Sequence, residues 1–237
     1  MIDFGFVTSQ GEREYNEDCI DKKFVNNQYF FVLADGLGAH GLGNIASQGA
    51  CDMSIQNAFT KSIEAIVEEI QDVLLKEQDK NGLINKMKTT ITMIEIYNNS
   101  YKQLHLGDSR IYHFNKRKII SITEDHSVCQ KLMKAGLIKK SELRHHKDRN
   151  KLLEVLGTKW TEPKPYVVTE GKFRKYEAVL LCTDGFWEWI EEKEMVKCLK
   201  KSKNAQEWID LMEEIVLQNG TGNHMDNYSA IGILYKD

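Results

Sequence analysis

Four acidic residues stand in settings that suit metal ligands. Asp35 follows the apolar run 30–34 and precedes Gly36, so we expect a buried strand to present its carboxylate at a rigid end. The other three stand in similar short motifs and are Asp108, Asp184 and Asp226. An ionised carboxylate at the edge of a protein core needs a cation as a partner. We therefore expect the four acids to converge on metal ions, with Asp35 at the centre.

A cluster of carboxylate oxygens indicates which metals could bind and which reaction they could support. Mg²⁺ and Mn²⁺ prefer oxygen ligands and retain several waters, so a few acids are enough to hold them. Close carboxylates without metal repel one another and raise each other's pKa, a cost that metal binding removes. Two such metals roughly 3.5–4 Å apart can bridge a water and lower its pKa, and the resulting hydroxide can attack phosphorus in line. Arg13, five residues before Asp18, is the expected phosphate ligand because a guanidinium matches phosphate oxygens.

The hydrophobic pattern predicts the elements that must position these acids. Strands are expected at 3–8, 19–24, 29–35, 89–97, 101–106, 110–114, 118–122, 165–170, 178–183 and 228–235. Helices are expected at 44–78 with a break near 60, after 126 to about 135, and at about 191–200 and 205–218. Strand meanders interrupted by helix pairs fit an α+β layered fold.

Seven short motifs match a known family in order along the chain. They are Gly11-Glu12-Arg13-Glu14-Tyr15-Asn16-Glu17-Asp18, Ala34-Asp35-Gly36, Thr89-Thr90, Gly107-Asp108-Ser109-Arg110, Thr123-Glu124-Asp125-His126-Ser127, Thr183-Asp184-Gly185 and Asp226-Asn227. Together they resemble the motifs of the PP2C-type metal-dependent protein serine/threonine phosphatases, in the compact bacterial form. The resemblance spans residues 9–235; each motif alone is weak, whereas seven in the right order are specific.

The resemblance implies a fold and a set of metal ligands. The fold is a four-layer α-β-β-α sandwich of two antiparallel sheets flanked by helix pairs, as one domain over 1–237, with a flap near 126–160 beside the cleft. Asp35 would bridge two metals, and the Gly36 carbonyl would bind one of them. Asp184 and Asp226 would hold the other metal. Asp18 would approach the site directly or through water.

The resemblance also implies supporting roles. Asp108 with Asp184 would form a third, weaker metal site, and Arg13 would bind the substrate phosphate. Glu17 would assist Asp18, and Asn227 would orient the ligands. Some positions depart from the family pattern, namely Leu37, Ala39, Asn44, Lys88, Tyr228 and Ser229. None of these departures removes a metal ligand. Leu37 replaces a histidine proposed as general acid in animal members, so water is expected to protonate the leaving group.

Simpler readings of the same residues stay open. Asp-Gly is a frequent turn, so Asp35 and Asp184 could be turn acids when each is taken alone. Asp108 could cap a turn or pair with Arg110, which is itself more simply a structural ion-pair partner than a substrate contact. The histidines His40, His126, His145 and His146 could be ligands but fit surface or loop positions.

Two other site types fit the sequence less well. Residues 36–41 fit a GxGxxG dinucleotide-binding loop, but an acid that would repel pyrophosphate precedes its first glycine. None of the five cysteines has an arginine six residues later, so a cysteine-dependent phosphatase loop is not indicated.

Composition sets the remaining expectations. The chain has 237 residues and a net charge of −3, and nothing points to nucleic acid. No apolar run approaches the roughly 20 residues of a membrane span. The five scattered cysteines suit free thiols in a reducing cytoplasm. We expect a cytoplasmic monomer.

The residues and the resemblance lead to one expected function. It is hydrolysis of phosphoserine and phosphothreonine in phosphoproteins by a metal-activated water at a dinuclear Mn²⁺ or Mg²⁺ centre. The expected partners are phosphoprotein substrates and a cognate serine/threonine kinase that the enzyme opposes. The alternative is a catalytically silent relative that binds phosphoproteins as a regulator.

Overall fold

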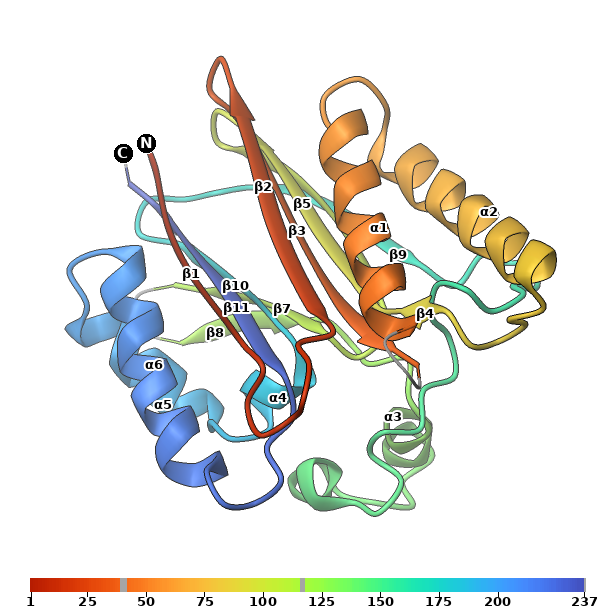
Figure 1. The fold of residues 1–237 in the computed structure, drawn as a ribbon. Coiled ribbons are helices and arrows are strands. Elements are labelled where there is room, and N and C mark those ends of the chain that lie inside the picture. Colours follow the sequence, from red (N-terminus) through yellow and green to blue (C-terminus); the bar gives the residue numbers. More distant parts are fainter. Residues whose placement is uncertain (39–41, 116–117, 237) are drawn as a thin grey trace.

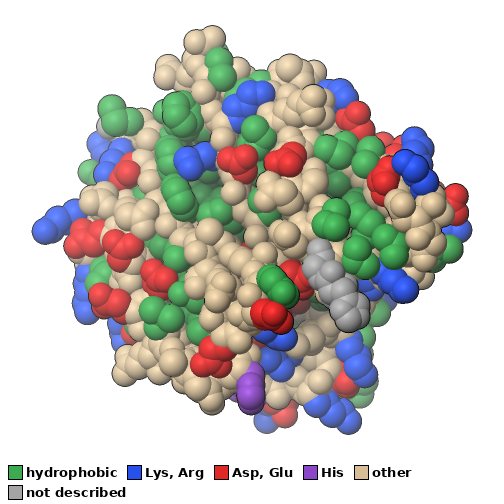
Figure 2. Space-filling view, viewed as in Figure 1, with side chains coloured by type: hydrophobic (Ala, Val, Ile, Leu, Met, Phe, Trp, Pro, Cys, Tyr) green, Lys and Arg blue, Asp and Glu red, His purple; other side chains and the backbone are tan. Residues whose placement is uncertain are grey.

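Two antiparallel sheets pack face to face, and helices cover their outer faces (Figure 1). The structure is a computed structural model that describes residues 1–38, 42–115 and 118–236. The predicted α+β sandwich is confirmed. No helix among the described residues is long and apolar enough to cross a membrane. On the face shown in Figure 2, basic and acidic side chains are interspersed.

The first sheet runs in the order β1-β11-β10-β7-β8. Its strands are β1 (Ile2–Ser9), β11 (Tyr228–Tyr235), β10 (Ala178–Cys182), β7 (Arg110–Phe114) and β8 (Ile119–Ile122). The second sheet runs in the order β2-β3-β5-β6-β9, with β4 paired to β3. Its strands are β2 (Asp18–Val25), β3 (Gln28–Leu37), β4 (Lys88–Thr89), β5 (Ile91–Tyr97), β6 (Ser100–Leu106) and β9 (Val167–Lys172).

The helices form one pair on each outer face, and shorter helices lie outside these pairs. α1 (Leu42–Asn57) and α2 (Ile63–Asn81) cover the second sheet, and α5 (Glu192–Lys201) and α6 (Ala205–Gly220) cover the first. The others are α3 (Val128–Lys134), the 3₁₀ helix η1 (Lys140–His145) and α4 (Asp184–Trp187). The predicted break near 60 is confirmed, and Ser62 caps the second helix by accepting from the Ala65 N–H.

Side-chain alternation along β3 separates two of the three cores. Phe30, Val32 and Ala34 pack against α1 and α2, whereas Phe31 and Leu33 lie between the two sheets. Asp35 continues the second row, so its side chain belongs to the inter-sheet face where β3 nears its end. The alternation that builds the core therefore also delivers the acid to the end of the sandwich.

The chain ends lie on neighbouring strands of the first sheet, and β1 closely approaches α6. The amide group of Gln206 exchanges two hydrogen bonds with the backbone of Phe6, at 3.1 and 3.2 Å. A Cβ added to Gly5 would overlap with the Gln206 backbone. Gly5 therefore fixes how near the helix can sit to the strand.

We predict that Gly5→Ala lowers the free energy of unfolding by about 1–3 kcal/mol, because the strand and helix must separate to admit the methyl group. Gly49→Ala is the matched control, because beyond the adjacent backbone of α1 no atom lies within 4 Å of the added Cβ. The control should raise stability by about 0.5–1 kcal/mol. Urea unfolding of both variants measures this, and equal effects would contradict the packing assignment.

Candidate metal centre

Asp18 and Asp35 face each other across two paired strands. They are register partners where β2 begins and β3 nears its end. Asp18 is 8% exposed, and its Oδ2 accepts a hydrogen bond from the Thr183 hydroxyl at 3.0 Å. Because Thr183 follows β10 of the opposite sheet, this bond joins the two sheets at the acidic end.

The other predicted acids come from the first sheet and the β6–β7 turn. Asp184 is the first residue of α4, and Asp226 stands two residues before β11. Asp108 follows β6 and is 4% exposed. The predicted strand at 178–183 ends at Cys182, so Thr183 serves as the first residue of the turn that presents Asp184.

The pKa values of these acids reflect their burial first and their proximity second. Burial raises the pKa of Asp18 to about 8, and Asp184 and Asp226 add to this rise. Burial raises the pKa of Asp184 to about 7, with repulsion from Asp226. The pKa of Asp35 is raised well above its ordinary value by burial and then by Asp18, Asp184, Asp108 and Asp226. The structure thus brings together all five predicted acids.

Two buried carboxylate oxygens at this site lack a partner. They are Oδ1 of Asp18 and Oε1 of its neighbour Glu17. Burying a carboxylate oxygen without a partner is costly, and a hard cation would remove that cost. Within the described ranges, no three His, Cys, Asp or Glu side chains are gathered as tightly as a ligand shell. An octahedral ion that keeps several waters needs fewer protein ligands than that, so the oxygen donors present fit Mg²⁺ or Mn²⁺.

The backbone around Asp35 is fixed by a pair of threonines. The Asp35 N–H donates to Thr90 Oγ1 at 3.0 Å, and the Thr89 hydroxyl donates to the Asp35 carbonyl at 2.9 Å. Thr90 Oγ1 also lies 2.7 Å from Ser109 Oγ, beside Asp108. These bonds explain why the Thr89-Thr90 motif accompanies the acids, a role that the sequence alone did not reveal.

Gly36 allows close contact between β3 and α1. A Cβ at this position would overlap with the carbonyl of Gly43. The Gly36 N–H donates to the Glu17 carbonyl at 3.1 Å. Gly36 and Leu37 pair with Thr89 and Lys88 as part of the strand, rather than opening a phosphate-binding loop. His40, for which a surface or loop position was preferred over a role as ligand, lies outside the described residues.

Arg13 lies at the mouth of the site in an ion pair. Its Nη2 is 2.8 Å from Asp226 Oδ2, with the two side chains 54% and 39% exposed. Both residues line a cavity of about 260 Å³ together with Glu14, Tyr15, Glu17, Gly38 and Asn227. A cation beside a cavity next to the acids is in position to meet an anionic group.

Asn227 holds the loop that carries Arg13. Its Oδ1 accepts from the Glu17 N–H at 2.9 Å, and its Nδ2 donates to the carbonyls of Gln10 and Tyr15 at 2.9 and 2.8 Å. Glu12 performs a similar task, because its carboxylate accepts from the N–H groups of Gly222 and Met225. Glu12 was not singled out by the sequence reading, although it belongs to the same motif.

Arg110 is a structural ion-pair partner, as predicted, but of Asp125 rather than Asp108. The pair is bidentate, with Nε and Nη2 at 2.8 and 2.7 Å from the two carboxylate oxygens. The guanidinium lies 3.5 Å from the ring centroid of Trp187, and the Trp187 indole donates to the Asp108 carbonyl at 3.0 Å. Arg144 donates to the Trp187 carbonyl. The buried pair thus supports the turn that holds Asp108.

A family model described as protein phosphatase 2C matches residues 9–227. The chain belongs to the protein phosphatase 2C family. It is 30% identical to the serine/threonine phosphatase Stp of Listeria monocytogenes, over 95% of this chain and 93% of that protein. It is 28% identical to the protein phosphatase PhpP of Streptococcus pneumoniae, over 67% and 69% of the two chains.

Solved structures of the family share the fold. The serine/threonine phosphatase Stp1 from Staphylococcus aureus matches with a TM-score of 0.89 and 26% identity, over 100% of this chain and 96% of that one. The catalytic domain of PstP, solved with two manganese ions, matches in fold with a TM-score of 0.85 and 22% identity, over 100% and 99%. This phosphatase 2C chain is therefore an enzyme, a protein serine/threonine phosphatase.

We predict that Asp125→Asn lowers the free energy of unfolding by about 3–5 kcal/mol, because Arg110 would remain as a buried, uncompensated charge. The control is Glu69→Gln, which breaks a pair with Lys61 whose side chains are both 41% exposed. That change should cost less than about 1 kcal/mol. Chemical denaturation compares the two, and similar losses would argue against a supporting role for the buried pair.

Proposed function

We propose that this enzyme hydrolyses phosphoserine and phosphothreonine in phosphoproteins at a centre of two Mn²⁺ or Mg²⁺ ions. Asp35, the Gly36 carbonyl, Asp18, Asp184 and Asp226 would hold these ions, and Asp108 would contribute to a third, weaker site. The observation that carries the proposal is the convergence of carboxylates at one end of the sandwich, where burial first and mutual repulsion second raise the pKa values of Asp18, Asp35 and Asp184. The manganese ions in the PstP structure, which has the same fold, support it.

The residues around the metal centre have separate roles in binding the substrate and in positioning the metal ligands. The metals, when bound, supply Lewis acidity and lower the pKa of water. Arg13 binds the substrate phosphate from the neighbouring cavity, because its guanidinium can exchange the Asp226 carboxylate for phosphate oxygens. Asn227 and Glu12 keep the Arg13 loop in register with the acids. Thr89 and Thr90 hydrogen-bond to the backbone of Asp35 and so keep its carboxylate positioned at the site.

The cellular setting is inferred from chemistry. A phosphoprotein phosphatase opposes a serine/threonine kinase, so we infer a cognate kinase whose products are the substrates. We also infer that 1–237 acts as one domain and as a monomer. The five cysteines are all free and buried, which supports a reducing cytoplasm.

We predict that purified protein hydrolyses p-nitrophenyl phosphate with Mn²⁺ or Mg²⁺ and stops when a chelator is added. Asp184→Asn should lower the rate of hydrolysis by more than the roughly 10–100-fold that is typical when a residue that only orients a metal ligand is changed. The reason is that Asp184 is itself a proposed metal ligand. Asp72→Asn, the same change at an exposed position on α2, should keep full activity. Folded wild-type protein that fails with both metals and on a phosphothreonine peptide would favour the silent phosphoprotein binder.

We predict that Arg13→Ala lowers kcat/KM about 10–100-fold, because one charge-assisted contact to phosphate is worth about 1.5–3 kcal/mol. Arg13→Lys should recover part of the lost kcat/KM, since lysine keeps the positive charge but lacks the bidentate guanidinium group. Arg174→Ala removes an exposed arginine elsewhere and should leave kcat/KM unchanged. Steady-state kinetics on a phosphothreonine peptide decides the matter, and an unchanged kcat/KM in Arg13→Ala would exclude phosphate binding by Arg13.

A further inference from the structure

An acidic side chain beside Arg13 is left without a partner. Glu12, one residue before Arg13, uses its carboxylate to accept from two backbone N–H groups. Glu14, one residue after it, forms no hydrogen bond or ion pair within the described part of the chain. Glu14 is exposed and lines the same cavity of about 260 Å³ as Arg13. Its carboxylate is therefore available to a charge carried by a bound substrate.

Tyr15 adds an aromatic ring to the same cavity. The residue is 64% exposed, and among the described residues its ring contacts no other ring and no cation. Its backbone is nevertheless fixed, because its carbonyl accepts from Asn227 Nδ2 at 2.8 Å. An aromatic face next to a free carboxylate suits a guanidinium group, which can pair with the acid and lie over the ring.

The charges of the cavity favour a cation beside the bound phosphate. Arg13 is the one basic residue among the described residues that line it, and the lining also carries Glu14, Glu17 and Asp226. In the proposed function, Arg13 takes the substrate phosphate and Asp226 takes a metal ion. Neither of them then neutralises Glu14, so a positive side chain of the substrate gains an ion pair and a negative one is repelled.

The spacing of Arg13 and Glu14 limits where that side chain stands in the substrate. The two residues are consecutive, with Cα atoms about 3.8 Å apart, and both line one cavity. An extended peptide advances roughly 3.3–3.6 Å for each residue. A cation that meets Glu14 while the phosphate meets Arg13 therefore belongs to a residue one or two positions away from the phosphorylated one.

We propose, on the basis of the function proposed above, that Glu14 and Tyr15 select phosphoproteins with an arginine within two residues of the phosphoserine or phosphothreonine. The guanidinium pairs with the Glu14 carboxylate and lies over the Tyr15 ring. Arginine is preferred to lysine because its planar group can make both contacts at once. An acidic residue at the same place is disfavoured by Glu14. The two residues thus act on the choice of substrate.

The test is steady-state hydrolysis of phosphothreonine peptides by the Mn²⁺-loaded protein. The parent peptide has alanine at the two positions on each side of the phosphothreonine, and one arginine or one glutamate replaces each alanine in turn. At least one arginine peptide should exceed the parent in kcat/KM by roughly five- to tenfold, because an exposed ion pair and a cation–π contact each contribute modestly. The glutamate peptide of the same position should fall below the parent.

Variants at position 14 separate the charge of Glu14 from its shape. Glu14→Gln keeps the shape and removes the charge, so the arginine advantage should shrink to about twofold or less. Glu14→Arg should reverse the order and favour the glutamate peptide. Each variant is judged by its own ratio of kcat/KM between the arginine and parent peptides, so a general change in activity cancels.

Two further variants complete the set. Tyr15→Leu keeps an apolar side chain without the aromatic face, and should lower the arginine advantage without removing it. Glu214→Gln is the matched control for Glu14→Gln, because Glu214 is exposed on α6 and does not line the cavity. The control should keep the ratio of the wild type.

Three results would count against the inference, and they differ from one another. Equal kcat/KM for arginine, alanine and glutamate peptides at every position would overturn it while the parent peptide and p-nitrophenyl phosphate are still hydrolysed. An arginine advantage that survives Glu14→Gln unchanged would overturn the assignment to Glu14. No turnover of either the parent peptide or p-nitrophenyl phosphate would overturn the proposed function, and this inference with it.

Discussion

The burial of several carboxylates close to one another is the constraint on which this structure depends. Five aspartates gather at one end of the sandwich, and burial together with proximity raises the pKa of Asp18 to about 8 and of Asp184 to about 7. Each rise measures how unfavourable the charged form is inside the folded protein. The three apolar cores must supply the stability that this end lacks, and divalent cations would offset the repulsion directly.

The end of the sandwich is held by hydrogen bonds that join separate parts of the chain. Thr183 links the first sheet to Asp18 of the second, and Thr90 links Asp35 to the β6–β7 turn. Arg13 partly neutralises Asp226 and faces the neighbouring cavity. Binding of a phosphate to Arg13 and binding of a metal to Asp226 would therefore each break the same ion pair.

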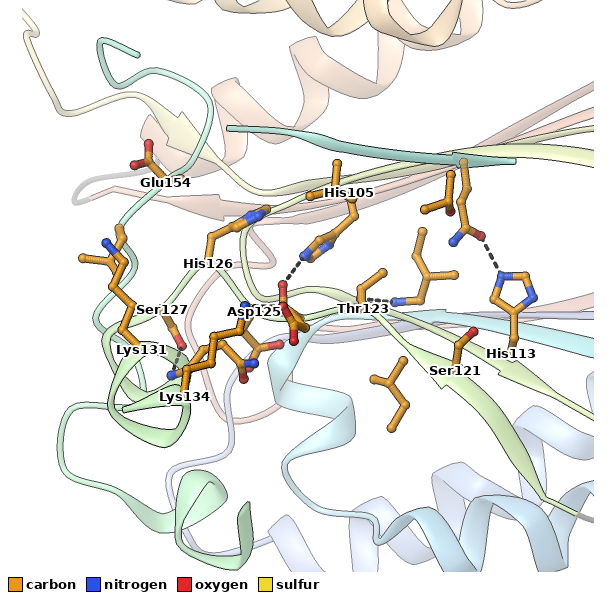
Figure 3. Close-up of a pocket in the computed structure, with 18 of the residues that line it drawn as sticks. His105, His113, Ser121, Thr123, Asp125, His126, Ser127, Lys131, Lys134 and Glu154 are labelled. Atoms are coloured by element: carbon orange, nitrogen blue, oxygen red, sulfur yellow. Dashed lines mark hydrogen bonds and ion pairs between the residues drawn. The ribbon is translucent and has the colours of Figure 1, made fainter. Parts of the chain in front are cut away.

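A cavity between the two sheets, lined among others by Gln103, His105 and His113, approaches the metal centre at one turn (Figure 3). His126 Nδ1 accepts from the Gly107 N–H at 3.0 Å, and the His126 N–H donates to the Gly107 carbonyl at 2.8 Å. Gly107 immediately precedes Asp108, and the next residue along from His126 caps α3 of the flap segment. The cavity and the metal centre are therefore connected through the hydrogen bonds of this turn.

The sequence by itself determined the strand that carries Asp35 near its end, the helix pairs and the ordered acidic motifs, because these depend on local periodicity and short-range chemistry. Only the tertiary structure decided which partners the polar residues take. Arg110 could have paired with Asp108, but folding placed Asp125 opposite its fork. Likewise, Gln103, His105 and His113 lie on two strands in an alternating pattern, and nothing local indicates that they enclose a cavity. Such pairings depend on how strands far apart in the sequence pack, and this is settled by the whole core.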